Sequence, residues 1–349
     1  MSKQNDGAGM GMGFARRHGV QGGSNGEKAK DIKVTLRTLL RYGKPQLAFV
    51  IVGIFCATIS SVLTLLGPGQ LSRITDIISE GMMTEIDLKA VVSICMLLLM
   101  IYGISALLGV MQGVSLATAA QKISRRLRTD VSEKINRLPI DYFNKTPYGD
   151  VLSRVTNDVD SMGQALNQSL GTLVSAVTIF LGSLLMMLLT NLILAGAAIA
   201  STLIGFVLMR LIMSRSQPYF VGQQRNLGAM NGYIEEIYTG HNVVKIYNGE
   251  ERAKAEFDAI NDALCSSAFR SQFMSSLMMP LMNFIGNFGY VAICVAGAIL
   301  VLNGSISFGV IVAFMLYVRF FTQPLSQLAQ VATAMQSAAA AGERVFEFL

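Results

Sequence analysis

The chain has 349 residues, of which 52% are hydrophobic and 14% are charged, and its formal net charge is +6. Soluble domains carry roughly 25% charged residues, so the composition excludes an ordinary soluble protein. The charge alone would suit a nucleic-acid partner, but its distribution along the chain explains it better, and no nucleic acid is expected. The four cysteines and two histidines are not spaced as metal ligands or redox pairs, so we expect reduced structural thiols and no metal site.

The chain begins with residues 1–26, which are rich in Gly and Met and contain no apolar run of the kind found in signal peptides. We expect this segment to be a disordered cytoplasmic tail. Residues 27–45 are amphipathic and basic, with Ile32, Leu36 and Leu39 among lysines and arginines. Such helices lie on the membrane surface, so the sequence predicts an elbow helix before the first span.

Six long apolar segments follow. A bilayer core of about 30 Å needs about 20 apolar residues per helix, and each segment is long enough to cross it. The segments lie at about residues 46–66, 90–118, 166–190, 192–213, 277–302 and 308–328. The sequence therefore predicts an all-α integral membrane protein, with a six-span domain over residues 46–335.

Lys and Arg residues collect on one side of these spans. Nine precede the first span, eight lie between the second and third, and seven lie between the fourth and fifth, whereas the opposite side carries only Arg73 and Lys89. Because basic segments stay in the cytoplasm, we expect both termini and both long inner segments to be cytoplasmic. We expect a multi-pass protein of the plasma membrane.

The two long inner segments have the periodicity of helices. Ile123, Leu127 and Val131 recur every four residues beyond the second span, and Leu227 and Ile234 belong to a similar stripe beyond the fourth. A helix rises 1.5 Å per residue, so the first of these helical stalks extends about 30 Å past the membrane.

Each stalk is predicted to end in a short tip. Pro139 and Pro147 lack amide donors, so the first stalk ends before Pro139 and about two helical turns fit between the prolines. Asp150 and Ser153 suit the first turn of the next helix, and glycines bracket the second tip at residues 240–249. Both tips carry aromatic residues, which indicates a partner surface; a solvated turn between helices is the alternative.

Three segments of this six-span pattern resemble the transmembrane domain of ATP-binding-cassette (ABC) exporters. Leu138–Asp158 is similar to the first intracellular loop of that family, Glu236–Glu250 to the second, and Ala340–Leu349 to the join with the nucleotide-binding domain. The resemblance covers roughly residues 35–349. It implies six long helices with cytoplasmic extensions and two coupling-helix loops.

The resemblance also implies partners and a mechanism. Two six-span chains would pair as a homodimer or heterodimer, with the fourth and fifth spans crossing to the partner, and the tips would be coupling helices seated in nucleotide-binding domains. ATP-driven closure would then switch the chains between inward-open and outward-open states. The implied coupling residues are Asp141, Tyr142, Phe143, Lys145, Tyr148, Gly240, Val244, Lys245 and Tyr247.

The sequence contains no Gly-x-x-x-x-Gly-Lys-Ser/Thr phosphate-binding loop. We therefore expect no catalytic residues and no ATP hydrolysis on this chain alone. The resemblance implies that ATP and Mg²⁺ are bound by a nucleotide-binding domain outside it. Residues 336–349 are expected to begin the linker to that domain, so the chain is interpreted as the transmembrane half of a longer polypeptide.

A charged residue marks the expected substrate path in the sixth span. Arg319 lies eleven residues after Phe308, which is about 16 Å along a helix and near the middle of the membrane. No Asp or Glu occupies any span, so its counter-charge would come from an anionic group of an amphipathic substrate, from a partner chain or from water reached by the long side chain. The predicted path comprises Gln112, Asn283, Phe284, Asn287, Phe288, Tyr317, Arg319 and Phe320. These residues would serve equally well as helix-packing core.

Three other classes of protein remain as alternatives. A secondary transporter or channel would not need ATP, but the chain shows no matched pair of interrupted helices and no acidic relay inside the spans. A membrane enzyme would need a cluster of His, Cys or carboxylate groups, which the spans lack. An accessory membrane protein whose stalks dock a separate ATPase chain is the third alternative.

Overall fold

The computed structural model describes residues 38–39, 41–82, 85–145 and 148–349 of the chain. The predicted tail at residues 1–26 and most of the predicted elbow helix at 27–45 lie outside the described residues. The helices are α2 (Leu47–Gly81), α3 (Leu88–Arg137), α4 (Ile140–Lys145), α5 (Tyr148–Ser153), α6 (Val159–Thr190), α7 (Leu192–Thr239), α8 (His241–Ile246), α9 (Glu250–Leu302) and α10 (Phe308–Phe348). A short 3-10 turn, η1 (Lys44–Gln46), leads into α2, and a π-helical turn, η2 (Arg154–Asp158), joins α5 to α6.

Six helices in the described part of the chain are long and apolar enough to cross a membrane, namely α2, α3, α6, α7, α9 and α10. The predicted six-span, all-helical architecture is therefore confirmed. Asn191 separates α6 from α7, as predicted, and its side chain accepts hydrogen bonds from the amides of Ile193 and Leu194. This Asn residue caps the N-terminus of α7.

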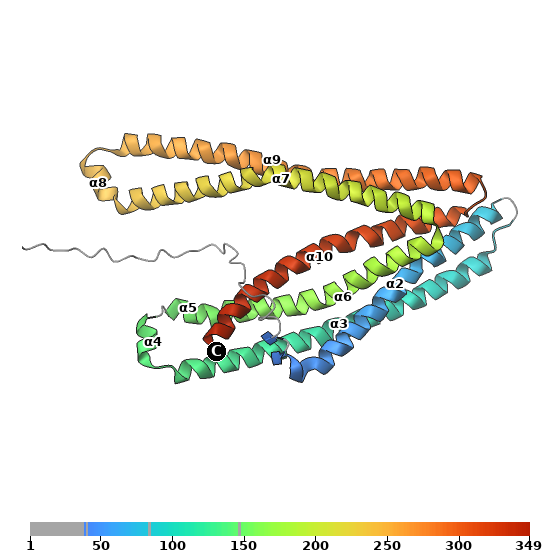
Figure 1. Ribbon diagram of the computed structural model, residues 1–349, viewed down its shortest axis with the longest axis horizontal. Coiled ribbons are helices and arrows are strands. Elements are labelled where there is room, and N and C mark those ends of the chain that lie inside the picture. The colour runs from blue at the N-terminus through green and yellow to red at the C-terminus, as the bar shows by residue number, and fades with distance from the viewer. Residues whose placement is uncertain (1–37, 40, 83–84, 146–147) are drawn as a thin grey trace, which may run out of the picture.

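The long helices form two groups (Figure 1). Helices α2, α3, α6 and α10 pack together as a four-helix bundle, and α7, α8 and α9 form a long hairpin beside it. We call the end that carries α4 and α8 the stalk end, and the opposite end the short-turn end. The hairpin and the bundle diverge toward the stalk end (Figure 1).

The hairpin contacts the bundle mainly near the short-turn end, through a cluster of buried residues. This short-turn cluster consists of Met187, Leu194, Ala195, Ala198, Ile293, Ala313, Phe314, Tyr317, Val318 and Phe321. Its members come from α6, α7, α9 and α10. The rings of Phe180 and Phe321 stack beside it with their centroids 4.9 Å apart. In the described part of the chain, the cluster therefore holds the two groups together mainly at one end.

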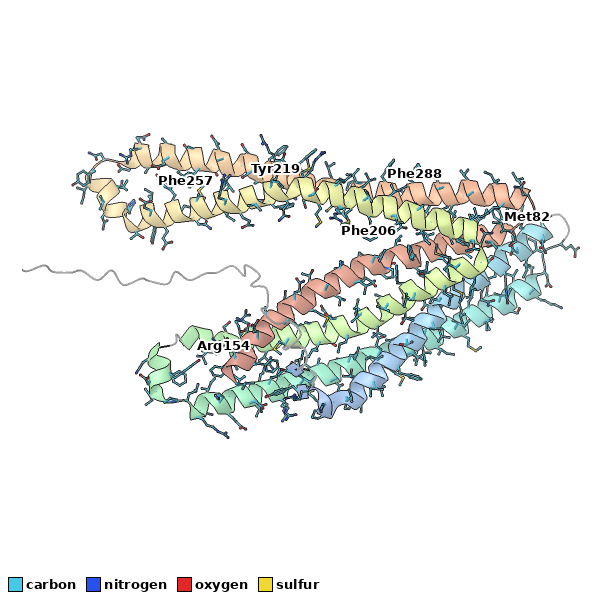
Figure 2. All side chains as sticks on the ribbon, viewed as in Figure 1. Met82, Arg154, Phe206, Tyr219, Phe257 and Phe288 are labelled. Atoms are coloured by element: carbon cyan, nitrogen blue, oxygen red, sulfur yellow. The ribbon has the colours of Figure 1, made fainter. Side chains whose placement is uncertain are left out.

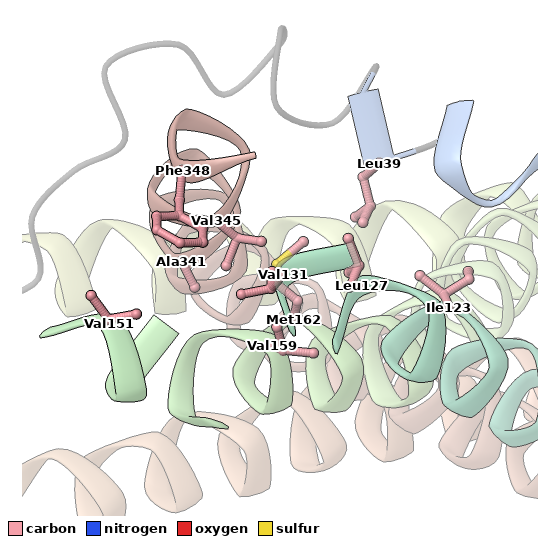
Figure 3. Close-up of a cluster of buried hydrophobic side chains, with 10 residues drawn as sticks. All are labelled: Leu39, Ile123, Leu127, Val131, Val151, Val159, Met162, Ala341, Val345 and Phe348. Atoms are coloured by element: carbon pink, nitrogen blue, oxygen red, sulfur yellow. The ribbon is translucent and has the colours of Figure 1, made fainter. Parts of the chain in front are cut away.

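A second buried cluster lies at the stalk end of the bundle (Figure 3). This stalk cluster consists of Leu39, Ile123, Leu127, Val131, Val151, Val159, Met162, Ala341, Val345 and Phe348. The predicted apolar stripe of the first stalk is thus confirmed as a packing face. The second stalk differs, because only α9 packs on α7 there: Met230 is buried, whereas Leu227 and Ile234 are 38% and 47% exposed.

The predicted helix boundaries at the prolines hold in part. Helix α3 ends at Arg137, and Leu138 adopts the extended backbone typical of a residue before proline. Pro68 lies inside the first spanning helix, since α2 continues through it to Gly81. The helix after the first tip begins at Tyr148, so Ser153 lies inside a helix and not in its first turn.

At the short-turn end, α2 caps the beginning of α10. The Asp76 carboxylate accepts hydrogen bonds from the Ser307 hydroxyl at 2.7 Å and from the Gly309 amide at 2.7 Å. We call these three residues the α2–α10 clasp. A Cβ atom at position 309 would collide with the Ser72 carbonyl oxygen and with Asp76, so only glycine fits this close approach.

Candidate functional site

One candidate site is a cavity of about 630 Å³ between the hairpin and α10. Ligand pockets typically enclose about 300–1,000 Å³, so this one can hold a small amphipathic molecule. Its walls come from three helices. The lining residues are Ser201, Thr202, Gly205, Phe206 and Met209 of α7, Ser275, Met278, Met279, Gly286, Gly289 and Tyr290 of α9, and Val318, Thr322, Leu325, Ser326 and Ala329 of α10.

Small residues create this cavity. At Gly286 an added Cβ would meet no atom within 4 Å, so the missing side chain leaves open space. At Gly289 an added Cβ would lie 3.0 Å from the Ser201 hydroxyl, so α7 and α9 approach closely there. The cavity wall is completed by methionines, whose flexible side chains adapt to ligands of different shape.

Arg319 does not itself line the cavity, but it directly follows the lining residue Val318 on α10. It is seven residues, or two helical turns, before the lining residue Ser326 and therefore on the same side of α10. Tyr317, two residues away, lies on the opposite side and is buried in the short-turn cluster. The Arg319 side chain is exposed and forms no ion pair in the described part of the chain.

A line of exposed polar residues continues from Arg319 toward the stalk end of α10. We call it the polar stripe of α10, and its members are Arg319, Gln323, Ser326, Gln330, Thr333 and Ser337. They recur at alternating spacings of four and three residues, which places them on one helix face. The stripe carries one positive charge and no acidic residue, and its other members offer hydrogen bonds only.

The structure brings only part of the predicted substrate path together. Tyr317 and Phe320 belong to or pack against the short-turn cluster. Gln112 lies between α3 and α6, beside Gly171, and is separated from the cavity by the bundle.

The predicted path residues of α9 divide between two faces. Phe284 and Phe288 are two residues to either side of Gly286, and so they lie on the opposite face of α9 from the cavity; they are 67% and 63% exposed. Figure 2 shows Phe288 pointing away from the bundle and Phe206 pointing toward it. Asn283 and Asn287 are exposed on the flank of α9.

Sequence reasoning missed the α7 wall of the cavity. Ser201, Thr202 and Gly205 interrupt an otherwise apolar span with small and polar residues within one helical turn. Small and hydroxyl residues are enriched where spanning helices approach one another. That spacing was the available signal for a wall on α7.

The two tips differ in their exposure. In α4, Ile140 is 80% exposed, but Tyr142 is half-buried and its ring contacts Phe143 and Phe348 with centroids 5.8 Å and 6.2 Å apart. Tyr142 therefore packs on the end of α10 in its own chain. Asp141 is exposed in α4, and the side chains of Lys145 and Tyr148 lie outside the described part.

Helix α8 is the more exposed tip. Ile246 and Tyr247 are 76% and 80% exposed, and Val244 is half-buried. Gly240 ends α7 by donating its amide to the Glu236 carbonyl at 2.8 Å. The Lys245 ammonium is 3.0 Å from the Glu250 carboxylate, so Lys245 is oriented by its own hairpin.

The stalk end also contains a partly buried ion pair that joins α10 to the turn before α6. Arg344 donates to both carboxylate oxygens of Asp158, at 2.6 Å and 3.0 Å. Asp158 is 7% exposed. This two-bond geometry fixes the end of α10 beside the first tip, and the two residues are 186 positions apart in sequence.

Tyr42, just before η1, adds a third contact to this end. Its hydroxyl donates to Asp130 of α3 at 2.9 Å, and its ring lies 5.6 Å from that of Phe346 of α10. Burial, together with the hydrogen bond to Asp130, raises the pKa of the Tyr42 hydroxyl. The phenol therefore stays protonated and keeps donating across the neutral pH range.

Comparisons with known proteins identify the family. The family model described as ABC transporter transmembrane region matches residues 50–325. The chain therefore belongs to the ABC transporter transmembrane family, as the resemblance of its loops predicted, and it is a multi-pass membrane protein.

Relatives share most of this chain. A fatty acid ABC transporter ATP-binding/permease protein of Mycobacterium bovis is 39% identical over 264 residues, which are 76% of this chain and 42% of the relative. An uncharacterized ABC transporter ATP-binding protein of Bacillus subtilis is 34% identical over 329 residues, 94% of this chain and 54% of the relative. A multidrug resistance-like ATP-binding protein of Buchnera aphidicola is 24% identical over 326 residues, 91% of this chain and 54% of the relative. The chain spans about half the length of the curated relatives it matches.

Proposed function

We propose that this chain is the transmembrane domain of an ATP-driven ABC exporter that moves an amphipathic substrate by alternating access. The observation that carries the proposal is the divergence of the hairpin from the bundle, with a cavity between α7, α9 and α10 and with the polar stripe of α10 running toward the stalk end. With the stalk end in the cytoplasm of a plasma-membrane protein, as the basic residues indicate, this arrangement corresponds to an inward-open state. A secondary transporter or channel remains the alternative.

The proposed assembly contains two six-span chains and two nucleotide-binding domains. The hairpin leaves large apolar side chains exposed along α7 and α9, including Val207, Leu211, Phe284 and Phe288, and a second six-span chain together with lipid would cover them. ATP and Mg²⁺ would bind to the nucleotide-binding domains, which would contact α4 and α8. Binding energy there would shift a two-state equilibrium of the spans.

For the substrate we propose an anionic amphiphile. The name of the mycobacterial relative specifies fatty acids. In this chain the apolar cavity would hold the hydrocarbon tail, and Arg319 beside it would hold the anionic headgroup. A neutral drug-like substrate is the second candidate, and the multidrug resistance-like relative supports it.

The first test addresses coupling through α8. Replacing Ile246 and Tyr247 together by Ala in the full-length protein should lower transport at least about tenfold and leave basal ATP hydrolysis unchanged, because losing a buried anchor costs about 2 kcal/mol of docking energy. Transport into inside-out vesicles and ATP hydrolysis are measured in parallel.

The control for this variant is Leu302→Ala, since Leu302 is 87% exposed but lies at the short-turn end. It should transport as the parent does. Unchanged transport by the double variant would show that α8 is a solvated turn.

The second test addresses the substrate. Arg319→Gln should reduce transport of a long-chain fatty acid about tenfold or more, because a hydrogen bond to a charged group contributes about 1.5–3 kcal/mol. Transport of the corresponding neutral alcohol should change little, and Arg319→Lys should retain part of the fatty-acid transport.

Gly286→Leu serves as the charge-neutral comparison. Its side chain would enter the open space at Gly286 and should reduce transport of long tails more than of short ones. Equal losses for the acid and the alcohol in Arg319→Gln would exclude Arg319 as the headgroup partner.

A further inference from the structure

A second hollow lies on the hairpin, next to the cavity on its stalk-end side. Two adjoining depressions of about 470 Å³ and 240 Å³ share Pro218 and Gly222 of α7. We call them together the Pro218 groove. Ser214, Gln217, Val221 and Arg225 of α7 line one part, and Tyr219 of α7 with Ala263, Ser266, Ser267 and Arg270 of α9 lines the other.

The sequence accounts for the shape of this groove. Pro218 has no amide hydrogen to complete the helical hydrogen bond to the Ser214 carbonyl. Gly222, one turn further, has no side chain, and an added Cβ would meet no atom within 4 Å. The Asn226 amide holds the two helices together beside it, donating to the Ala263 carbonyl at 3.1 Å and to the Ser267 hydroxyl at 3.0 Å. The groove is therefore a built feature of the hairpin.

Among the described residues, the groove is lined by two arginines and by no acidic residue. Residues 192–234 contain three arginines and no acidic residue, whereas on α9 Asp262 directly precedes the lining residue Ala263 and Arg270 is the charged residue of the range 263–302. Arg225 and Arg270 are both exposed, and within the described ranges neither forms an ion pair. Two guanidinium groups thus border one groove, and serine and glutamine side chains supply further donors.

The groove lies at the depth in the membrane that is expected for lipid headgroups. Pro218 is 26 residues from the start of α7, which is about 39 Å at 1.5 Å per residue, and a bilayer with its headgroup regions is about 40–45 Å thick. Arg225 lies seven residues beyond Pro218, about 10 Å further along the helix, and Arg270 lies 32 residues, about 48 Å, from the end of α9. From these positions, long arginine side chains can reach back to the interface.

Aromatic side chains surround this level of the hairpin. Tyr219, Phe220, Phe269 and Phe273 are exposed there, between 36% and 71%. The rings of Phe269 and Phe273 stack with centroids 6.3 Å apart, and Figure 2 shows Tyr219 near the middle of the hairpin. Tyr and Trp residues are enriched at the boundary between membrane and water, so Tyr219 indicates that this boundary passes through the groove.

We propose that the Pro218 groove binds the headgroup of an anionic phospholipid from the cytoplasmic leaflet, with Arg225 and Arg270 as its ion partners. Basic pockets between spanning helices on the cytoplasmic side bind anionic headgroups. A lipid bound there fixes the depth of the hairpin in the membrane. The proposal relies on the orientation of the chain in the membrane that is given under Proposed function. Binding of the lipid does not depend on which substrate the protein transports.

The experiment measures lipid binding to the full-length protein. The protein is reconstituted in nanodiscs of phosphatidylcholine alone or with about one third phosphatidylglycerol, and its thermal midpoint and the phosphatidylglycerol retained after delipidation are recorded. Phosphatidylglycerol should raise the midpoint, and inorganic phosphate added to phosphatidylcholine nanodiscs should not. Arg225→Gln with Arg270→Gln should lower the affinity for phosphatidylglycerol at least about tenfold, the factor expected for one charge-assisted hydrogen bond.

Two further variants make the result specific. Gly222→Leu keeps both charges but fills the groove, and should also lower retention of phosphatidylglycerol. Arg252→Gln with Lys254→Gln removes two charges near the stalk end of α9 and should retain phosphatidylglycerol as the parent does. Equal retention by the Arg225/Arg270 variant and the parent would overturn the proposal. If inorganic phosphate raised the thermal midpoint as much as phosphatidylglycerol does, the groove would bind a soluble anion. That result would also overturn the proposal.

Discussion

Asp158→Ala should lower the free energy of unfolding by about 2–3 kcal/mol. Removing one partner of a fully buried ion pair costs about 3–5 kcal/mol, because the other charge stays buried and unpaired. Here Asp158 is 7% exposed, but the Arg344 side chain is 41% exposed and can regain water, so we expect a smaller cost. Thermal unfolding followed by the helical circular dichroism signal measures it.

The control for this prediction is Asp160→Ala. Asp160 pairs with Arg128 on the surface, where the two side chains are 52% and 45% exposed, and surface pairs contribute about 0–1 kcal/mol. If both variants lose the same stability, the pair between Asp158 and Arg344 does not hold the end of α10.

Loss of this ion pair should also weaken the proposed coupling between the first tip and the spans. The reason is that the pair positions α10 beside that tip.

Gly309→Ala should be strongly destabilising, by about 2–3 kcal/mol, which is the upper part of the range for overpacking. Its methyl group would meet the Ser72 carbonyl and Asp76, and backbone atoms cannot move aside as a flexible side chain can. The shift would also weaken the hydrogen bond from the Gly309 amide to Asp76. The thermal midpoint of the variant measures the effect.

Gly109→Ala is the matched control, because Gly109 lies on α3 where an added Cβ meets nothing within 4 Å. Alanine favours a helix over glycine by about 1 kcal/mol, so this variant should be as stable as the parent or more so. A Gly309→Ala protein with the parent's midpoint would contradict the close approach of α2 and α10.

The architecture followed from local rules. Hydropathy located the six spans. Inside the bilayer each span must form its backbone hydrogen bonds within itself, so a long apolar segment has to be a helix. Pro139 ended α3, glycines bracketed α8, and the stripe from Ile123 to Val131 became the packing face of the first stalk. These features depend on residues close together in sequence, and short-range physics therefore predicted them.

The candidate site was harder to predict, for two physical reasons. Lipid is as apolar as a helix interface, so apolar residues do not reveal which face of a spanning helix is buried; Phe284 and Met279 are equally suitable by composition, yet only Met279 lines the cavity. Contacts such as Asp158 with Arg344, and Tyr142 with Phe348, join distant positions. Only the packing of whole helices determines such contacts.

The attachment of the hairpin mainly at one end has a mechanical consequence. Helix α9 has 53 residues and is therefore about 80 Å long, so pivoting it by about 5° at its attached end displaces α8 by about 7 Å. A substitution that barely alters the attachment can thus change how far the free end travels. The converse also holds. A partner that moves α8 by several ångströms tilts the hairpin by only a few degrees where it meets α10.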